Sequence, residues 1–279
     1  MQIGFNPMKF LLVLVFTAFL MSPAAAQSLP PGGISGSIAE PSPSNLALTW
    51  QQAFVVVPGS PVWKGRLADM PALDGKRPVA LFMHGSSGLA DFTEEFQSWL
   101  ASIGIASIAP NSFAIADRLK YASPVPVSLY ERIHALRSAE LANAIAQARG
   151  LPWVDADKLI VIGSSEGAVP VARLGAAPGV AARVILSWSC EASYFVDGPR
   201  TATPKDAAVL TAIASRDPFF SPLNPWNAGH ATTGSCASAL RYHTQAMNVV
   251  IATDQHTIMN LPATRDIIAP FLRRTVQIP

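Results

Sequence analysis

Two adjacent serines stand where an apolar run meets a run of small residues, in the stretch LIVIGSSEGAVPVARL (159–174). Gly163, Ser165 and Gly167 match the pattern G-x-S-x-G between a predicted strand and a predicted helix. Such a sharp turn strains its central residue, and the glycines remove Cβ atoms that would collide across it. We therefore expect Ser165 to present a nucleophilic hydroxyl and Ser164 to point into the structure. The alternative is a Ser/Gly-rich turn that only caps a helix.

A nucleophilic serine needs a base, and the base needs an acid that orients it. Asp217 comes just after the predicted strand AVLTAIA and suits the role of the acid. Glu191, which follows the preceding predicted strand, is its main rival, and Asp197 and Asp254 are weaker ones. An ordinary turn aspartate before Pro218 is the structural alternative for Asp217.

The base is predicted to be His256, one of five histidines in the chain. It ends the stretch NVVIATDQH, downstream of both the serine and the acid, after the last predicted strand. His134 lies within a long predicted helix, and His230 lies in a loop rich in proline and glycine. His243 precedes the last strand, and His84 belongs to a glycine-rich loop that has a different predicted role.

That loop is HGSSG (84–88), which follows the apolar run VALFM. Acyl transfer needs two N–H donors placed where negative charge develops on the substrate oxygen. We expect one donor to be the backbone N–H of Glu166 and the other to come from Ser86 or Ser87. The Glu166 side chain need only complement the dipole at a helix N-terminus. A flexible glycine turn is the alternative for this loop.

Alternating strands and helices must position these groups. The alternation predicts right-handed crossovers and a mostly parallel sheet flanked by helices, an α/β fold in a single domain. The carboxyl ends of parallel strands meet at one edge, where functional groups gather. Strands are predicted at 47–59, 62–71, 77–85, 105–113, 158–163, 183–190, 207–217 and 247–256, and helices at 91–104, at 128–150, from about 166, and at 258–275.

The N-terminus has the features of a secretory signal. A lysine precedes an apolar run from Phe10 to Met21, and Ala24-Ala25-Ala26 before Gln27 fits an A-x-A cleavage site. The apolar run is shorter than the roughly 20 residues that span a bilayer, which disfavours a membrane anchor. We expect a periplasmic or secreted protein with no membrane anchor after cleavage.

These features divide the chain into three predicted parts. Residues 1–26 form the signal peptide, and residues 27–45, rich in proline, glycine and serine, form a flexible segment. Residues 46–279 form the folded domain. Half of the residues are hydrophobic, which is enough for one large core. The net charge of +2 without a basic cluster argues against a nucleic-acid partner, and the oligomeric state stays open.

Two cysteines, Cys190 and Cys236, lie in the exported part of the chain. An oxidising compartment favours a disulfide between them, and two buried free thiols are the alternative. No histidine stands at ligand spacing from either cysteine, so we expect no metal site. We also expect no cofactor.

Taken together, HGSSG, GSSEG, Asp217 and DQH resemble the α/β-hydrolase superfamily, and within it the dienelactone-hydrolase-like and prolyl-oligopeptidase-like serine esterases. The resemblance covers the chain from about Pro78 onwards and implies the roles of nucleophile, acid and base for Ser165, Asp217 and His256. Dienelactone hydrolases proper carry a cysteine at the nucleophile position, so the resemblance implies their fold but not their substrate.

The implied function is hydrolysis of small to medium carboxylic esters through an acyl-enzyme intermediate. A serine peptidase or amidase of the same fold is the closest alternative, and a non-catalytic binding protein is the alternative from another class. Aromatic residues on or beside the loops near the predicted site either line a substrate pocket or cover the core. These residues are Trp188, Tyr194, Phe195, Phe219, Phe220 and Trp226.

Overall fold

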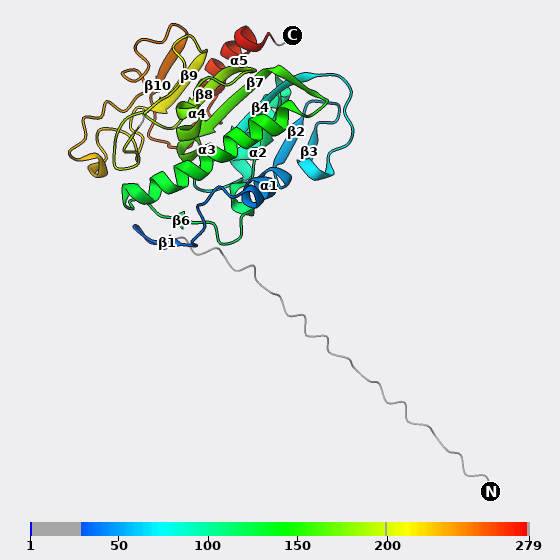
Figure 1. The fold of residues 1–279 in the computed structure, drawn as a ribbon, viewed down its shortest axis with the longest axis horizontal. Coiled ribbons are helices and arrows are strands. Elements are labelled where there is room, and N and C mark those ends of the chain that lie inside the picture. Colours follow the sequence, from blue (N-terminus) through cyan, green and yellow to red (C-terminus); the bar gives the residue numbers. More distant parts are fainter. Residues whose placement is uncertain (2–28, 199, 278–279) are drawn as a thin grey trace.

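The chain folds around an eight-stranded sheet in the computed structural model, which describes residues 29–198 and 200–277 together with Met1 (Figure 1). The strand order is β10-β9-β8-β7-β4-β5-β2-β3, and all pairs from β10 to β5 are parallel. The strands are β2 (Phe54–Val57), β3 (Trp63–Arg66), β4 (Arg77–Met83), β5 (Ala106–Ala109), β7 (Val154–Ser164), β8 (Val180–Leu186), β9 (Val209–Ala214) and β10 (Ala246–Ile251).

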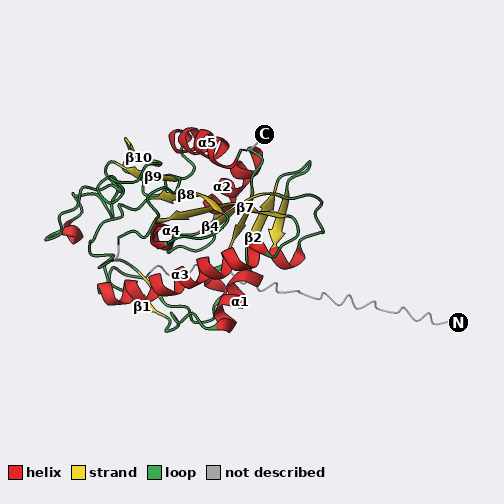
Figure 2. Ribbon diagram, turned by 45° about the horizontal axis from the view of Figure 1, so that its top comes forward, coloured by secondary structure: helices red, strands yellow, loops and turns green. Residues whose placement is uncertain are grey.

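Helices cover both faces of this sheet (Figure 2). Leu81 of β4 packs in one core cluster with Tyr130 of α3 (Val127–Arg149). Its neighbour Phe82 packs in a second cluster with Phe96 of α2 (Asp91–Ser102) and Phe271 of α5 (Pro262–Val276). Strands buried on both faces explain why their sequences are nearly continuous apolar runs. The helices are α1 (Pro43–Gln51), α2 (Asp91–Ser102), α3 (Val127–Arg149), α4 (Ala168–Arg173) and α5 (Pro262–Val276).

The described helices include none that is both long enough and apolar enough to span a bilayer. The predicted signal peptide, residues 1–26, lies outside the described residues apart from Met1. The mostly parallel sheet flanked by helices, expected from the alternation of strands and helices, is confirmed.

The segment predicted to be flexible, residues 27–45, is instead attached to the domain from about Leu29. Its strand β1 (Ile34–Ser35) pairs antiparallel with β6 (Lys120–Tyr121), and Ile38 forms a further bridge with Arg118. The composition pointed to flexibility, but the backbone groups of this segment find partners in a loop that is distant in sequence, which the composition cannot reveal.

Helix α1 is a second departure from expectation, because residues 47–51 were predicted as part of a strand. Ser42 caps the helix by accepting a hydrogen bond from the Asn45 backbone N–H at 3.2 Å, and Pro43 occupies its first turn. Both are helix-start signals. The strand begins only at Phe54, after the helix has ended.

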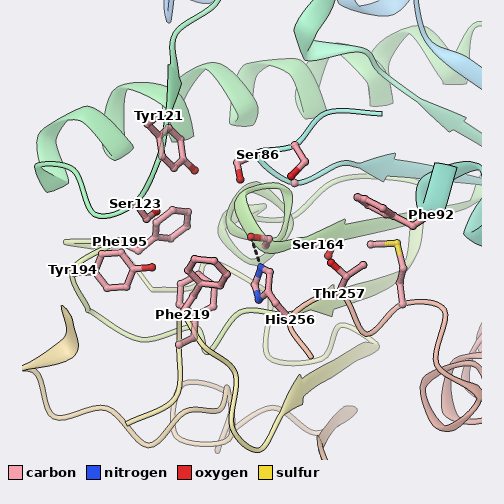
Figure 3. A pocket seen from close by; sticks show the side chains of 15 residues that line it. Ser86, Phe92, Tyr121, Ser123, Ser164, Tyr194, Phe195, Phe219, His256 and Thr257 are labelled. Atoms are coloured by element: carbon pink, nitrogen blue, oxygen red, sulfur yellow. Dashed lines mark hydrogen bonds between the residues drawn. The ribbon is translucent and has the colours of Figure 1, made fainter. Parts of the chain in front are cut away.

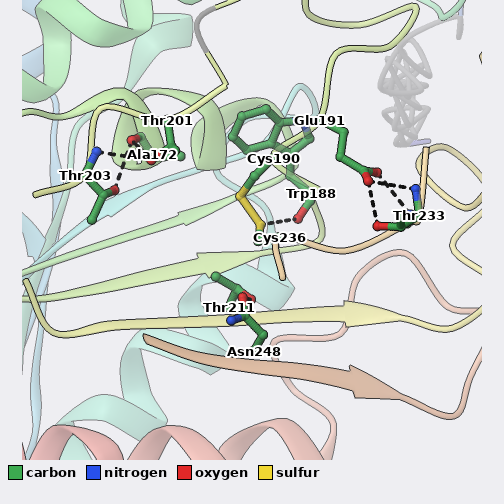
Figure 4. Close-up of a disulfide and its surroundings, with 11 residues drawn as sticks. Ala172, Trp188, Cys190, Glu191, Thr201, Thr203, Thr211, Thr233, Cys236 and Asn248 are labelled. Carbon is green, nitrogen blue, oxygen red and sulfur yellow. Dashed lines mark hydrogen bonds between the residues drawn. A yellow bond between two sulfur atoms is a disulfide. The ribbon is translucent and has the colours of Figure 1, made fainter. Parts of the chain in front are cut away.

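A disulfide joins Cys190, just after β8, to Cys236 in the long loop before β10 (Figure 4). Both cysteines are buried, and the bridge ties together segments 46 residues apart. The long loop runs past the carboxyl ends of β8 and β9, and the bridge therefore anchors this loop to the core.

Replacing both cysteines with alanine is expected to lower the free energy of unfolding by about 4 kcal/mol, the chain-entropy value for a loop of this length. The double substitution leaves no free thiol to form other pairs. Urea unfolding, followed by circular dichroism, measures the loss. Dithiothreitol should shift the wild-type midpoint and leave the midpoint of the variant unmoved; equal midpoints for all samples would contradict the prediction.

Candidate active site

Ser165 follows β7 in a left-handed backbone conformation, with φ of 55°. A Cβ at Gly163 would lie 2.0 Å from the Gly167 carbonyl oxygen, and one at Gly167 would lie 2.1 Å from that of Met83. Only glycine fits at either position, so the G-x-S-x-G pattern has a direct steric cause. A 3-10 turn (Ser165–Gly167) then leads into α4, while Ser164 ends β7 with 4% of its surface exposed.

Ser165, His256 and Asp217 form one hydrogen-bonded chain. His256 Nε2 lies 2.9 Å from Ser165 Oγ, and His256 Nδ1 lies 2.8 Å from Asp217 Oδ2. An ionised carboxylate only accepts hydrogen bonds, so Nδ1 carries the ring proton and the bare Nε2 accepts from the serine hydroxyl. The imidazole is thus held in the tautomer that a general base requires.

Asp217 is completely buried, and its second oxygen is also engaged. Oδ1 accepts hydrogen bonds from the backbone N–H groups of Phe219 at 2.9 Å and Phe220 at 3.1 Å. Ser187 Oγ donates to the His256 carbonyl at 2.5 Å and fixes the loop that carries the ring. Asp217 and His256 follow the neighbouring parallel strands β9 and β10, which brings them to the same edge of the sheet.

The rival acid, Glu191, is bound elsewhere. One of its oxygens accepts from the Thr233 backbone N–H at 2.7 Å and from Thr233 Oγ1 at 2.6 Å, and the other accepts from the Gly234 N–H at 3.0 Å (Figure 4). Glu191 therefore holds the loop that contains Cys236. The structure brings Asp217, and not Glu191, to His256.

The HGSSG loop follows β4 and places Gly85, Ser86 and Ser87 in the same cavity as Ser165. His84 is buried: the Ser112 N–H donates to its Nε2 at 3.2 Å, so its Nδ1–H donates to the Gly85 carbonyl at 2.7 Å. Burial, followed by the charge of a nearby arginine, holds the pKa of His84 well below its ordinary value. This neutral ring shapes the loop and makes no bond to Ser165.

A cavity of about 290 Å³ opens onto Ser165 and His256. Tyr121, Ser123, Tyr194 and Phe195 stand on one side of the His256 ring and Phe92 on the other (Figure 3). The complete lining is Gly85, Ser86, Ser87, Phe92, Tyr121, Ser123, Ser164, Ser165, Tyr194, Phe195, Phe219, Phe220, His256, Thr257 and Met259.

The predicted substrate-binding aromatics fall into two groups. Tyr194, Phe219 and Phe220 line the cavity, and the Phe219 ring lies 4.6 Å from the His256 ring. Trp188 is completely buried in the core, and Trp226 does not line the cavity but packs against the Tyr194 ring. Trp188 and Trp226 thus fit the alternative interpretation, in which the aromatic residues pack against other residues and do not line the substrate pocket.

A buried ion cluster behind Ser165 was not expected from the sequence. The Glu166 side chain is completely buried, and its Oε1 lies 2.7 Å from Arg118 Nη2 and 3.5 Å from Arg137 Nε. Arg137 also bonds to Glu140, and Arg118 Nε donates to Ser112 Oγ, which in turn donates to Glu140. The five side chains close a ring.

This ring changes the role of Glu166, which was expected only to complement a helix dipole. Burial alone would raise the pKa of Glu166, but the charges of Arg118 and Arg137 outweigh burial and hold the pKa below its ordinary value. Arg137 Nη2 also donates to the His84 carbonyl at 2.8 Å. The cluster thereby ties the turn after Ser165 to the HGSSG loop, the two segments with the predicted oxyanion donors.

Comparison with known proteins identifies the fold. In sequence, no family model matches this chain, and no curated protein does either. In structure, the chain is similar to TT1662 from Thermus thermophilus, with 16% identity, a TM-score of 0.51 and coverage of 83% of this chain and 96% of that one. It is also similar to Est1E from Butyrivibrio proteoclasticus in complex with ferulic acid, with 13% identity, a TM-score of 0.50 and coverage of 81% and 95%. The chain has the α/β-hydrolase fold, in a single domain.

Proposed function

We propose that this protein is a serine hydrolase that cleaves small to medium carboxylic esters through an acyl-enzyme intermediate. Ser165 is the nucleophile, His256 the general base and acid, and Asp217 the carboxylate that orients the imidazole. The observation that carries the proposal is the unbroken chain of hydrogen bonds from Asp217 through His256 to Ser165, which ends in an open and largely aromatic cavity.

The reaction follows from this chain. His256 Nε2 takes the hydroxyl proton as Ser165 Oγ attacks the ester carbonyl carbon, and the carbonyl oxygen becomes an oxyanion. The backbone N–H of Glu166 and that of Ser86 or Ser87 stabilise the oxyanion; each such donor typically contributes about 3–4 kcal/mol to transition-state stabilisation. His256 then protonates the departing alcohol, and water releases the acyl group by the same steps in reverse.

The disulfide supports an oxidising compartment as the place where the enzyme works, because thiols stay reduced in the cytosol. Together with the predicted signal peptide, it leads us to place the mature enzyme in the periplasm or outside the cell. The substrate is then a small ester present in that space.

A fluorophosphonate probe tests the nucleophile directly. Ser165 Oγ should displace fluoride from the phosphorus and remain covalently phosphonylated, because His256 accepts its proton. Mass spectrometry of the tryptic peptide 159–173 should show the added mass, and fragmentation should place it on Ser165. The label should persist in Ser164→Ala; an unlabelled wild-type protein would favour the binding-protein alternative.

The same preparation separates esterase from amidase. Short-chain p-nitrophenyl esters should be hydrolysed much faster than peptide p-nitroanilides, because an enzyme built for esters need not expel an amine, which is a poorer leaving group than an alcohol or phenol. Comparable rates on both substrate types would instead support the peptidase or amidase alternative.

A further inference from the structure

One side of the cavity carries a hydroxyl whose proton is already committed. Tyr121 is half-buried and lines the cavity, and its phenolic O–H donates to Glu166 Oε2 at 2.9 Å. Glu166 can only accept in this bond, because Arg118 and Arg137 keep it ionised despite its burial. Burial, followed by the Glu166 charge, raises the pKa of Tyr121 well above its ordinary value. Tyr121 therefore stays a neutral phenol whose oxygen offers only lone pairs to the cavity.

Ser123 and Tyr194 together offer the complementary group beside it. The Tyr130 hydroxyl accepts from the Val125 N–H at 3.2 Å and donates to Ser123 Oγ at 2.8 Å, so Ser123 keeps its own proton. Ser123 donates this proton to the Tyr194 hydroxyl, which thereby keeps its own proton to donate. Tyr121 and Tyr194 stand on the same side of the cavity (Figure 3). An acceptor and a donor thus face the same part of the cavity.

The charges around this side favour neutral ligands. The described residues that line the cavity include no lysine and no arginine. The guanidinium of Arg118 is 1% exposed and already bonds Glu166, Ser112 and the Leu119 carbonyl. Within the ion cluster, the charges of the two arginines cancel those of the two glutamates. A ligand carboxylate here would lose its hydration without gaining a cation, which is unfavourable.

We propose that Tyr121 is a specificity-determining residue, which makes the enzyme select neutral esters with a hydroxyl-bearing aromatic ring over esters with a carboxylate at that position. The ring packs against Phe195, and its hydroxyl donates to Tyr121 and accepts from Tyr194. A hydroxyl both donates and accepts, whereas a carboxylate can only accept. This inference rests on the proposed esterase function.

Two series of three esters test the proposal, one for each orientation of the ester. The first comprises methyl 3-phenylpropanoate and its 4-hydroxyphenyl and 4-carboxyphenyl analogues; the second comprises the acetates of 2-phenylethanol and its two corresponding analogues. The saturated spacers insulate the ester carbonyl from the ring substituent, so differences in kcat/KM report binding of the ring.

In at least one series, wild-type kcat/KM should be about 3–10-fold higher for the hydroxyl analogue than for the plain ring, as one neutral hydrogen bond allows. It should be at least tenfold lower for the carboxyl analogue. In Tyr121→Phe the hydroxyl-to-plain ratio should fall to near one. Tyr242→Phe, which changes an exposed tyrosine outside the cavity, should keep the wild-type ratios.

The wild-type ratios alone already decide the matter if Tyr121→Phe fails to fold. Equal rates on plain and hydroxyl rings in both series, or a preference for the carboxyl analogues, would overturn the inference and leave the esterase proposal intact. A wild-type ratio that survives in folded Tyr121→Phe would overturn the role of Tyr121. If the protein hydrolysed neither the six esters nor any p-nitrophenyl ester, the proposed esterase function itself would be overturned.

Discussion

Ser165→Ala is expected to lower kcat for p-nitrophenyl ester hydrolysis by about 10⁶-fold, to the level left by binding and the oxyanion donors. Alanine removes the atom that His256 activates at 2.9 Å, and neither Asp217 nor the oxyanion donors can replace a missing nucleophile. Steady-state kinetics against active-site-titrated wild-type enzyme measures the loss. A residual rate of this size requires a preparation free of contaminating esterases, so the variant should be purified from a strain that lacks them.

Ser164→Ala is the matched control, because it removes a hydroxyl one residue away that bonds to neither His256 nor Asp217. We expect kcat to change by less than tenfold in this variant. Both variants should unfold at similar urea concentrations, since each loses only one oxygen. Wild-type turnover in Ser165→Ala, or a comparable collapse in both variants, would contradict the assignment of the nucleophile.

The features that the sequence predicts well are those with local causes. The turn at Ser165 can be predicted because any tight strand-to-helix turn creates close contacts that require glycine at positions such as Gly163 and Gly167. The strands of the sheet can be predicted because strands buried on both faces have continuous apolar sequences. The positions of Asp217 and His256 after strands then follow from the rule that parallel strands end at a common edge.

The features that the sequence does not predict depend on partners far along the chain. Glu166 bonds to Arg118 and approaches Arg137, and no spacing pattern connects the three residues. In a long helix, an arginine three residues from a glutamate predicts an ion pair exposed to solvent, yet Arg137 and Glu140 are both buried. The available signal was a charged residue within a buried turn, because an ionised group in such a place needs a partner.

Asp217→Asn is expected to lower kcat by about 10⁴-fold. The cause can be traced atom by atom. The backbone N–H groups of Phe219 and Phe220 both point at Oδ1 and require an oxygen there. The asparagine NH₂ must then take the place of Oδ2 and donate to His256 Nδ1, which loses its proton. The ring proton moves to Nε2 and faces Ser165 Oγ, so the imidazole can no longer act as the base.

Glu191→Gln is the matched control for this experiment, because it replaces another buried carboxylate near the same edge by its amide. Here the amide NH₂ must face either Thr233 or the Gly234 N–H, which both donate in the wild-type protein. The lost bonds should lower the free energy of unfolding by about 1–3 kcal/mol. kcat should stay within tenfold of wild type, since Asp217 and His256 keep their contacts. A large loss of kcat in Glu191→Gln with near-normal turnover in Asp217→Asn would assign the acid to Glu191 and require a different arrangement of the loops around His256.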